Sequence, residues 1–218
     1  MWVRPVAWCD GPYSRVLMGA EFLPGMRPEK KDVAACGARC DHRRMVYTIR
    51  QTRREDWQLL RDLRLAALKD PVAPVAFFEP YDEALALTRG DWERRASGRA
   101  RVTFIGETES GVWGGMVGAF VRDDHVWVVG VYMRPEHRGT GLAEALMRAA
   151  IDWAGGRETR LRVHENNQRA ARFYASLGFR PTGGAETDPR DPALKAYELA
   201  FAPHAPGPAT TPGEKAEA

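Results

Sequence analysis

Alternating apolar and polar positions, the period of a half-buried β-strand, recur along this chain. The segments with this period are residues 46–50, about 101–107, 112–122 and 125–133, then 160–163 and 194–201. Short turn sequences, Glu109-Ser110-Gly111 and Asp123-Asp124, separate the second, third and fourth of these segments. Because such residues favour tight turns, we expect these three strands to form antiparallel hairpins.

Four other segments show the helical period, in which apolar residues recur every three or four positions. They are a helix that begins near Thr52 and ends before Pro71, a second over about 82–95, a third over 140–154 and a fourth over 167–176. Thr52 and Glu55 have capping-box spacing, so we expect them to open the first helix. Gly155 and Gly178 follow the last two helices, where glycine commonly ends a helix. The segment 71–81, rich in proline and phenylalanine, is predicted to be a loop without regular helix.

The order of these elements indicates the fold class. Strands that meander in the middle of the chain and alternate with helices in its second half are typical of a mixed sheet with helices on both faces. We therefore predict an α/β fold, called α+β in another naming scheme. Its centre is expected to be a mixed, mostly antiparallel sheet of about six to seven strands, flanked by about four helices.

The chain divides into three parts by composition. Residues 1–44 mix glycine, proline and isolated apolar residues without a periodic pattern, and Met45 comes directly before the first strand. We expect 1–44 to be a flexible extension or the product of a start codon assigned too early. Residues 45–202 are predicted to form one domain, since this length can bury one substantial core. The tail 203–218, rich in Pro, Ala, Thr, Lys and Glu, is expected to be disordered.

Hydropathy and charge exclude several classes of partner. The sequence contains no apolar run of about 18 residues and no secretory signal pattern, so a cytoplasmic protein without a membrane partner is expected. The formal net charge is +3, and residues 1–44 hold 8 Lys/Arg against 5 Asp/Glu, which leaves 24 of each in the remainder. A neutral domain carries no nucleic-acid footprint, so no nucleic-acid partner is expected.

Cysteine positions argue against disulfides and metal. The three cysteines, Cys9, Cys36 and Cys40, all lie in the first forty residues, so no disulfide framework is expected in the domain. With His42 they are candidate zinc ligands. Their spacing differs from the two regular knuckles of structural zinc sites, so we favour thiols in an unstructured segment and predict no metal.

A glycine-bearing turn links the strand that ends at Met133 to the next helix. At a helix start the backbone N–H groups are unpaired, the helix dipole adds positive potential, and glycine lets an anion approach. Arg138 adds a planar cationic donor beside Gly139 and Gly141. A plain strand-to-helix turn is the alternative. A P-loop is excluded because no Lys-Ser or Lys-Thr follows the glycines, and a dinucleotide fingerprint is excluded because Glu144 occupies its third glycine position.

Two motifs resemble those of the GNAT superfamily of N-acetyltransferases. The first has Arg or Gln, two residues, Gly, one residue, then Gly or Ala, and the second has Asn, Ala, Tyr and Gly-Phe in a fixed order. The matching residues are Arg138, Gly141 and Ala143 in the first, and Asn167, Ala170, Tyr174, Gly178 and Phe179 in the second. Together with the strand order, the resemblance covers about residues 46–201.

The resemblance implies acetyl-CoA as cosubstrate. In the family, the strand before the turn pairs with the pantetheine arm as if with another strand, and the turn holds the pyrophosphate. The cofactor-binding residues implied here are Val131, Tyr132, Met133, Arg138, Gly139, Thr140, Gly141, Leu142, Ala143 and Asn167. Tyr174 corresponds to the catalytic acid that protonates the departing thiolate, which a phenol with a pKa of about 10 can do. The alternative for Tyr174 is packing, beside Phe173, between helix and sheet.

The general base and the acceptor site are less defined. Many relatives carry a Glu on the strand before the turn, whereas this chain has no carboxylate in 126–130. His125 and Glu79 are candidate bases, and a water chain or direct capture of free amine is the alternative. The loop residues Phe78, Glu79 and Tyr81 are candidate substrate contacts, because aromatic rings with one carboxylate suit a small cationic amine; a hydrophobic lid over the core is the alternative.

The combined prediction is an N-acetyltransferase that moves an acetyl group from acetyl-CoA to a primary amine of a small molecule or peptide by direct attack on the thioester. The alternative is a regulatory module that binds acetyl-CoA without catalysis. The absence of a carboxylate at 126–130 motivates this alternative. Many relatives form homodimers, and no sequence feature here distinguishes a monomer from a homodimer.

Overall fold

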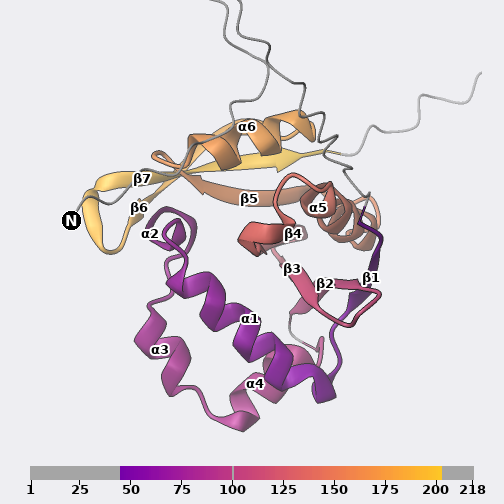
Figure 1. Ribbon diagram of the computed structural model, residues 1–218. Coiled ribbons are helices and arrows are strands. Elements are labelled where there is room, and N and C mark those ends of the chain that lie inside the picture. The colour runs from indigo at the N-terminus through magenta and orange to yellow at the C-terminus, as the bar shows by residue number, and fades with distance from the viewer. Residues whose placement is uncertain (1–44, 100, 203–218) are drawn as a thin grey trace, which may run out of the picture. The chain divides into compact units, whose positions relative to one another are not determined.

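The computed structural model describes residues 45–99 and 101–202 of the chain. Seven strands form one sheet in the order β1-β2-β3-β4-β5-β7-β6 (Figure 1). They are β1 (Tyr47–Gln51), β2 (Val102–Thr108), β3 (Trp113–Arg122), β4 (His125–Met133), β5 (Thr159–His164), β6 (Arg180–Asp188) and β7 (Asp191–Phe201). The predictions for 1–44 and 203–218, with Cys9, Cys36, Cys40 and His42, lie outside the described residues.

The sheet is mixed, as predicted. Every neighbouring pair of strands is antiparallel except β4 and β5, which run parallel. The predicted fold class is therefore confirmed, and the strand number reaches the upper end of the expected range. In the described part of the chain, no helix has the length and apolar character needed to cross a membrane.

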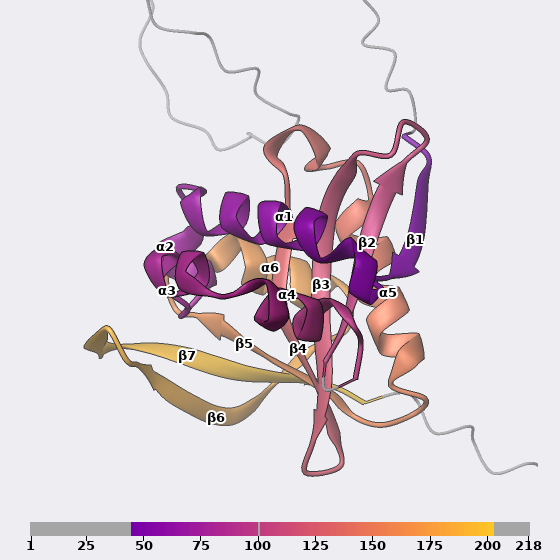
Figure 2. The same cartoon turned by 90° about the horizontal axis from the view of Figure 1, so that it is seen from below.

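Helices cover both faces of the sheet (Figure 2). They are α1 (Trp57–Lys69), α2 (Ala73–Ala76), α3 (Tyr81–Ala86), α4 (Arg89–Ala96), α5 (Leu142–Trp153) and α6 (Gln168–Ser176), with single 3-10 turns η1 (Arg54–Asp56) and η2 (Pro135–His137). One core contains Leu63 of α1 and Ile105 of β2, and the other contains Leu146 of α5 and Phe104 of β2. Neighbouring strand residues point to opposite faces, so β2 separates the two cores.

The region between α1 and β2 differs from the prediction. The single helix expected over 82–95 is two helices, α3 and α4, because Thr88 caps α4: its Oγ1 accepts from the Asp91 N–H at 3.3 Å, and the Asp91 carboxylate accepts from the Thr88 N–H at 2.9 Å. The loop predicted for 71–81 contains one helical turn, α2. Pro74 is tolerated there because a first-turn residue has no intrahelical N–H bond to lose.

The predicted capping box of Thr52 and Glu55 is wrong. The Thr52 hydroxyl is buried and donates to the carbonyl of Ala96 at the end of α4, at 2.9 Å. The Asp56 carboxylate instead accepts from the Arg53 N–H at 2.8 Å, one residue later than expected. Thr52 therefore bonds to the end of α4 instead of capping the helix that follows it. Its burial determines this choice of partner.

Two boundaries near the candidate site also shift. The helix expected from residue 140 begins at Leu142, because residues 135–137 form the separate turn η2 and Gly141 adopts a left-handed φ of 87°. After Phe179, β6 and β7 form a hairpin whose turn lies between Asp188 and Asp191; the strand β6 was not predicted. The sheet thereby extends past the end of β5.

Candidate active site

The two parallel strands at the centre of the sheet separate from each other. β4 pairs with β5 only at Val126 with Thr159 and Trp127 with Arg160. β4 nevertheless continues to Met133, and β5 continues to residue 164. Beyond the paired positions, each strand therefore has an edge without a strand partner that faces the other strand.

A β-bulge turns the end of β4. Gly130 and Val131 together face the single β3 residue Val117, and Gly130 has a left-handed φ of 63°. After the bulge, the Arg134 N–H donates to a β3 carbonyl at 2.8 Å. Because main-chain groups of successive strand residues point to opposite edges, those of Met133 face the gap toward β5.

A cavity of about 470 Å³ occupies this gap, bounded by β4, β5, α2, α6 and the turn before α5. Of the residues predicted for the cofactor, eight line it: Val131, Tyr132, Met133, Arg138, Gly139, Gly141, Ala143 and Asn167. The predicted acid Tyr174 and the predicted substrate contact Phe78 line it as well. Folding thus brings both sequence motifs, which are about thirty residues apart, to one cavity.

The turn before α5 is open toward the cavity. Gly139 and Gly141 have left-handed φ values of 77° and 87°, and a Cβ added at either glycine would meet no atom within 4 Å. No side chain among the described residues caps the start of α5, although Ala145 and later amides bond within the helix. The first amides of a helix without a cap are donors that an anion can accept.

The Arg138 guanidinium beside the turn is already hydrogen-bonded within the protein. Its Nη2 donates to the Asp70 carboxylate at 2.5 Å, and its Nε donates to the carbonyl of Met133 at 3.1 Å. The Asp70 side chain is only 4% exposed, so Arg138 compensates a buried charge. The guanidinium lines the cavity while it ties the turn to the start of the α1–α2 connection.

Thr140 and Leu142, also predicted for the cofactor, are not among the residues that line the cavity. The Thr140 hydroxyl donates to the carbonyl of His137 at 2.8 Å and accepts from Tyr47 at 3.2 Å. Leu142 is buried over the β2 residue Gly106, where an added Cβ would lie 2.2 Å from its Cδ1. Both side chains hold the turn in place, and only their main-chain amides remain available to a ligand.

Tyr174 is buried at one wall of the cavity. Its ring meets Phe179 edge to face with 6.0 Å between ring centroids. Burial raises the pKa of the Tyr174 phenol above its ordinary value. The hydroxyl is therefore protonated throughout the physiological pH range and can act as a proton donor.

Asn167 caps α6 and joins it to α2. Its Oδ1 accepts from the Ala170 N–H at 3.1 Å, and its Nδ2 donates to the carbonyl of Val75 at 3.2 Å. The predicted cofactor contact thus also has a structural role. Asn167 fixes the distance between two walls of the cavity.

Glu79 and Tyr81, predicted as substrate contacts with Phe78, do not line the cavity. Glu79 accepts from Arg64 Nε at 2.9 Å and from Arg95 Nη2 at 2.8 Å. Burial raises the pKa of Glu79, but the hydrogen bonds from the two arginines outweigh it, so the pKa is lowered overall. The Tyr81 ring packs under the Lys69 ammonium at 4.7 Å. The carboxylate expected to bind a cationic amine is thus already neutralised.

His125 is also far from the reacting end of the cavity. It opens β4 at the opposite end from the bulge, and its Nδ1 lies 3.6 Å from a Glu158 oxygen. The residue does not line the cavity. Neither His125 nor Glu79 is therefore placed as a base.

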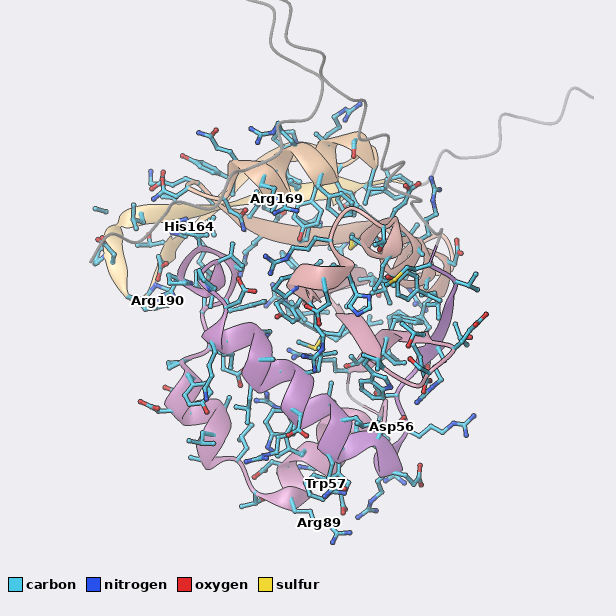
Figure 3. The ribbon with its side chains drawn as sticks, viewed as in Figure 1. Asp56, Trp57, Arg89, His164, Arg169 and Arg190 are labelled. Atoms are coloured by element: carbon cyan, nitrogen blue, oxygen red, sulfur yellow. The ribbon has the colours of Figure 1, made fainter. Side chains whose placement is uncertain are left out.

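Sequence reasoning missed a buried group of polar side chains beside the cavity (Figure 3). His164 lines the cavity, and its Nε2 lies 3.4 Å from the Asp188 carboxylate. His164 Nδ1 accepts from the Asn166 N–H at 3.1 Å, so the proton of the neutral ring is on Nε2, toward Asp188. Hydrogen bonds from Arg190 lower the pKa of Asp188 to about 2.

Arg190 extends this group to the opposite wall. It donates through Nη2 to the carbonyl of Pro74 at 2.6 Å and through Nη1 to that of Phe77 at 2.9 Å. The β6–β7 hairpin is thereby joined to the α2 segment, of which Phe77 lines the cavity. No periodic pattern or motif marks residues 164, 188 and 190 in the sequence, because only the hairpin fold brings them together.

Comparison with curated proteins gives short, clear matches. An uncharacterized N-acetyltransferase of Mycobacterium bovis is 46% identical over 57 residues, which cover 24% of this chain and 36% of the relative. A peptidyl-lysine N-acetyltransferase of Salmonella typhimurium is 36% identical over 58 residues, 27% of this chain and 39% of the relative. The matched segment thus spans well under half of each relative.

Solved structures match over a larger part of the chain. A GCN5-related N-acetyltransferase from Kribbella flavida is 19% identical with a TM-score of 0.57, covering 72% of this chain and 97% of that one. An acetyltransferase of the GNAT family from Streptococcus pneumoniae is 21% identical with a TM-score of 0.56, covering 72% and 99%. At this identity the likeness concerns the fold.

The family model described as "Acetyltransferase (GNAT) family" matches residues 57–179, more than half of the chain. This range includes the separated part of β4, the turn before α5 and both sequence motifs. The family predicted from those motifs is therefore confirmed. The chain belongs to the GNAT family of acetyltransferases.

Proposed function

We propose that this protein is an N-acetyltransferase that transfers the acetyl group of acetyl-CoA to a primary amine. The observation that carries the proposal is the separation of β4 from β5, which opens a cavity that ends at the uncapped turn before α5. One end of this cavity offers the edge of a strand and the other offers helix-start amides. Acetyl-CoA has an amide-bearing arm and a pyrophosphate that fit these two features respectively.

The space at the turn before α5 and its free main-chain amides fit a bound pyrophosphate. Gly139 and Gly141 leave open space where side chains would stand, and the amides of 142–144 are not bonded within α5 because they form its first turn. The β4 edge at Val131 and Met133 would bind the pantetheine amides as an added strand does. Arg169, exposed on α6, also lines the cavity and adds a cation to this side.

Acetyl-CoA supplies an activated acetyl thioester. The acceptor nitrogen forms the new C–N bond as the C–S bond breaks; one proton of the acceptor ammonium goes to solvent and a second reaches the departing sulfur. Tyr174 holds a proton at its phenol oxygen in the cavity wall. We propose that it gives this proton to the sulfur and takes the second proton of the acceptor nitrogen in return, so that the phenol is restored. Its burial excludes water from this step.

The acceptor proton has no side-chain base in this proposal. His137 and His164 line the cavity, but His137 Nδ1 is bonded to the Tyr47 hydroxyl at 2.9 Å and His164 Nδ1 to the Asn166 amide. Glu144 is paired with Arg148 at 2.7 Å. The acceptor is therefore proposed to react as the free amine, after loss of its proton to solvent.

Isothermal titration with acetyl-CoA, followed by thiol release across an amine panel, tests the proposal. Saturable binding together with amine-dependent thiol release is expected. Wild-type protein that does not bind acetyl-CoA would refute it. Tight binding without thiol release for any amine would instead favour the regulatory alternative.

The catalytic unit is proposed to be residues 45–202. Two chains, 1–218 and 45–202, should show the same acetyl-CoA affinity and the same kcat. A large loss of either in the shorter chain would place residues 1–44 or 203–218 in the working enzyme.

A further inference from the structure

A second, smaller hollow lies on the α1–α4 face of the sheet, and its volume is about 40 Å³. About 10–15 Å³ is enough for one water, so the hollow has room for a group of about three non-hydrogen atoms. Arg64, Arg95 and Arg101 line it, together with Trp92, Thr103 and apolar residues. No acidic residue of the described chain is in this lining.

The positive charge here exceeds the negative charge. Glu79 binds both Arg64 and Arg95, so one carboxylate serves two guanidinium groups. Arg101, exposed at one edge of the hollow, has no ion pair among the described residues and packs over the Phe120 ring at 5.5 Å. Three cations around one anion leave a net charge of about two, which favours an anionic ligand.

Two donors in the lining have no acceptor. Arg64 Nη1 is buried without a hydrogen-bond partner, and the Trp92 indole N–H is equally unpaired although its side chain is 1% exposed. Both groups can only donate, and a buried donor without an acceptor is costly. The missing partner must therefore be a group that accepts hydrogen bonds. Burial lowers the pKa of Arg64, as expected for a cation in need of a counter-charge.

The hollow adjoins the proposed reaction site. Val129 and Gly130 line both the hollow and the large cavity. At the bulge, an added Cβ on Gly130 would lie 3.6 Å from Arg64 Nη1, so glycine leaves that approach open. The Arg64 guanidinium also stacks at 4.5 Å on Phe77, a residue of the large cavity.

We propose that this hollow binds the carboxylate of the acceptor, so that the acceptor is a free amino acid rather than a polyamine or a simple amine. A carboxylate has two oxygens that accept charge-assisted hydrogen bonds, and it matches the size and the positive charge of the hollow; Arg64 Nη1 is the donor still free, because Nε and Nη2 of Arg64 contact Glu79. The Glu79 carboxylate is already paired with two arginines, so it carries no free negative charge to bind a cationic substrate. The proposal rests on the proposed acetyl transfer and names its acceptor class.

Matched acceptor pairs test it. Phenylalanine, tryptophan and leucine are compared with the amines that lack their carboxylates and with their neutral carboxamides, using thiol release from acetyl-CoA. The amino acids should have a kcat/KM about 10- to 100-fold higher, the effect of one charge-assisted contact. Equal or better acetylation of the decarboxylated amines overturns the carboxylate site and leaves acetyl transfer intact.

Variants locate the effect. Arg101→Gln should raise KM for the amino acids about 10-fold and leave KM for the decarboxylated amines unchanged, because an exposed guanidinium with no ion pair is removed. Arg99→Gln, an exposed arginine two residues away, is the control and should change neither. An Arg101→Gln enzyme with unchanged KM for the amino acids contradicts the assignment.

A titration without turnover separates the two proposals. Sodium propionate should shift the Nε–Hε NMR signal of Arg64, identified by its loss in Arg64→Lys, whether or not acetyl-CoA is bound. A protein that binds propionate but not acetyl-CoA would refute acetyl transfer alone. Absence of any shift, as expected if the hollow holds only water, refutes the carboxylate site.

Discussion

The two sides of the candidate site are built in different ways. On the donor side, the turn before α5 presents main-chain amides and two glycines with left-handed φ values. On the acceptor side, the hollow under α1 and α4 presents long cationic side chains around one shared carboxylate. In the proposed function, main-chain groups would bind the part that all acyl-CoA donors share, whereas side chains would bind the acceptor, which can vary. On this proposal, the donor side carries the family resemblance and the acceptor side determines the specificity.

The largest effect is expected from the acid at the donor side. Tyr174→Phe removes the phenol proton and retains the edge contact with Phe179. We expect kcat to fall about 100-fold or more, with KM for acetyl-CoA little changed. Steady-state kinetics at pH 7 measure it. A variant with wild-type kcat would show that Tyr174 only packs, and that the donor side contributes binding groups but no proton donor.

Arg138→Ala tests whether Arg138 binds acetyl-CoA directly or stabilises the fold through its pair with Asp70. The change leaves the Asp70 carboxylate buried without its partner. We expect a loss of about 2 kcal/mol in the free energy of unfolding, less than for a fully buried pair because Arg138 is partly exposed. Urea denaturation measures it. The double change Asp70→Asn with Arg138→Ala should recover most of the stability. If it also recovers acetyl-CoA affinity, Arg138 acts through the fold.

Gly141→Ala tests the main-chain character of the donor side. A side chain at this left-handed position both strains the backbone and enters the space left open for the ligand. Acetyl-CoA affinity is expected to fall about 10-fold, with a stability loss of about 1 kcal/mol. Gly98→Ala is the matched control, since Gly98 has a φ of 73° and equally open surroundings but does not line the cavity. Equal loss of affinity in both variants would contradict a phosphate cradle.

The smallest effect concerns pH and the pair of Asp188 with Arg190. The pKa of Asp188, about 2, lies below the value of about 3.9 expected in the unfolded chain. Its contribution to stability is therefore complete above pH 4 and is lost as the pH falls toward 2. Asp188→Asn should lower the melting temperature at pH 7. The difference from wild type should shrink between about pH 4 and pH 2. A difference independent of pH would assign the effect to packing.

Sequence patterns predicted the strand, the turn and the helix on the proposed donor side, because the determinants of these elements are local. The alternation of 125–133 coincides with β4, and the strand, turn and helix that form the cradle are contiguous in the chain. The acceptor side depends on Arg64, Glu79, Arg95 and Arg101, which come from separate elements. Each of them alone has the pattern of a solvated surface residue. Only packing of α1 and α4 on β2 brings them together, so no local period indicates the cluster.

Boundary errors have a similar cause. Thr52 has the spacing of a helix cap, yet tertiary contact with the end of α4 takes its hydroxyl. Thr88 and Asp91 carry the same local signal as a true cap, and it divides a segment that hydropathy alone makes continuous. The local sequence predicts a helix cap at both Thr52 and Thr88. Only Thr88 forms one, because Thr52 is buried against the end of α4.

The Leu142 side chain packs directly against two glycines of the sheet region, Gly106 and Gly114. Added methyl groups at Gly106 and Gly114 would come within 2.2 and 2.9 Å of its side chain, so these glycines set how closely the first turn of α5 docks on the sheet. The height of the first turn of α5 above the strands thus depends on two residues about thirty positions upstream that do not line the cavity. If this turn binds the donor as proposed, a larger residue at either position would change donor affinity by lifting the start of the helix.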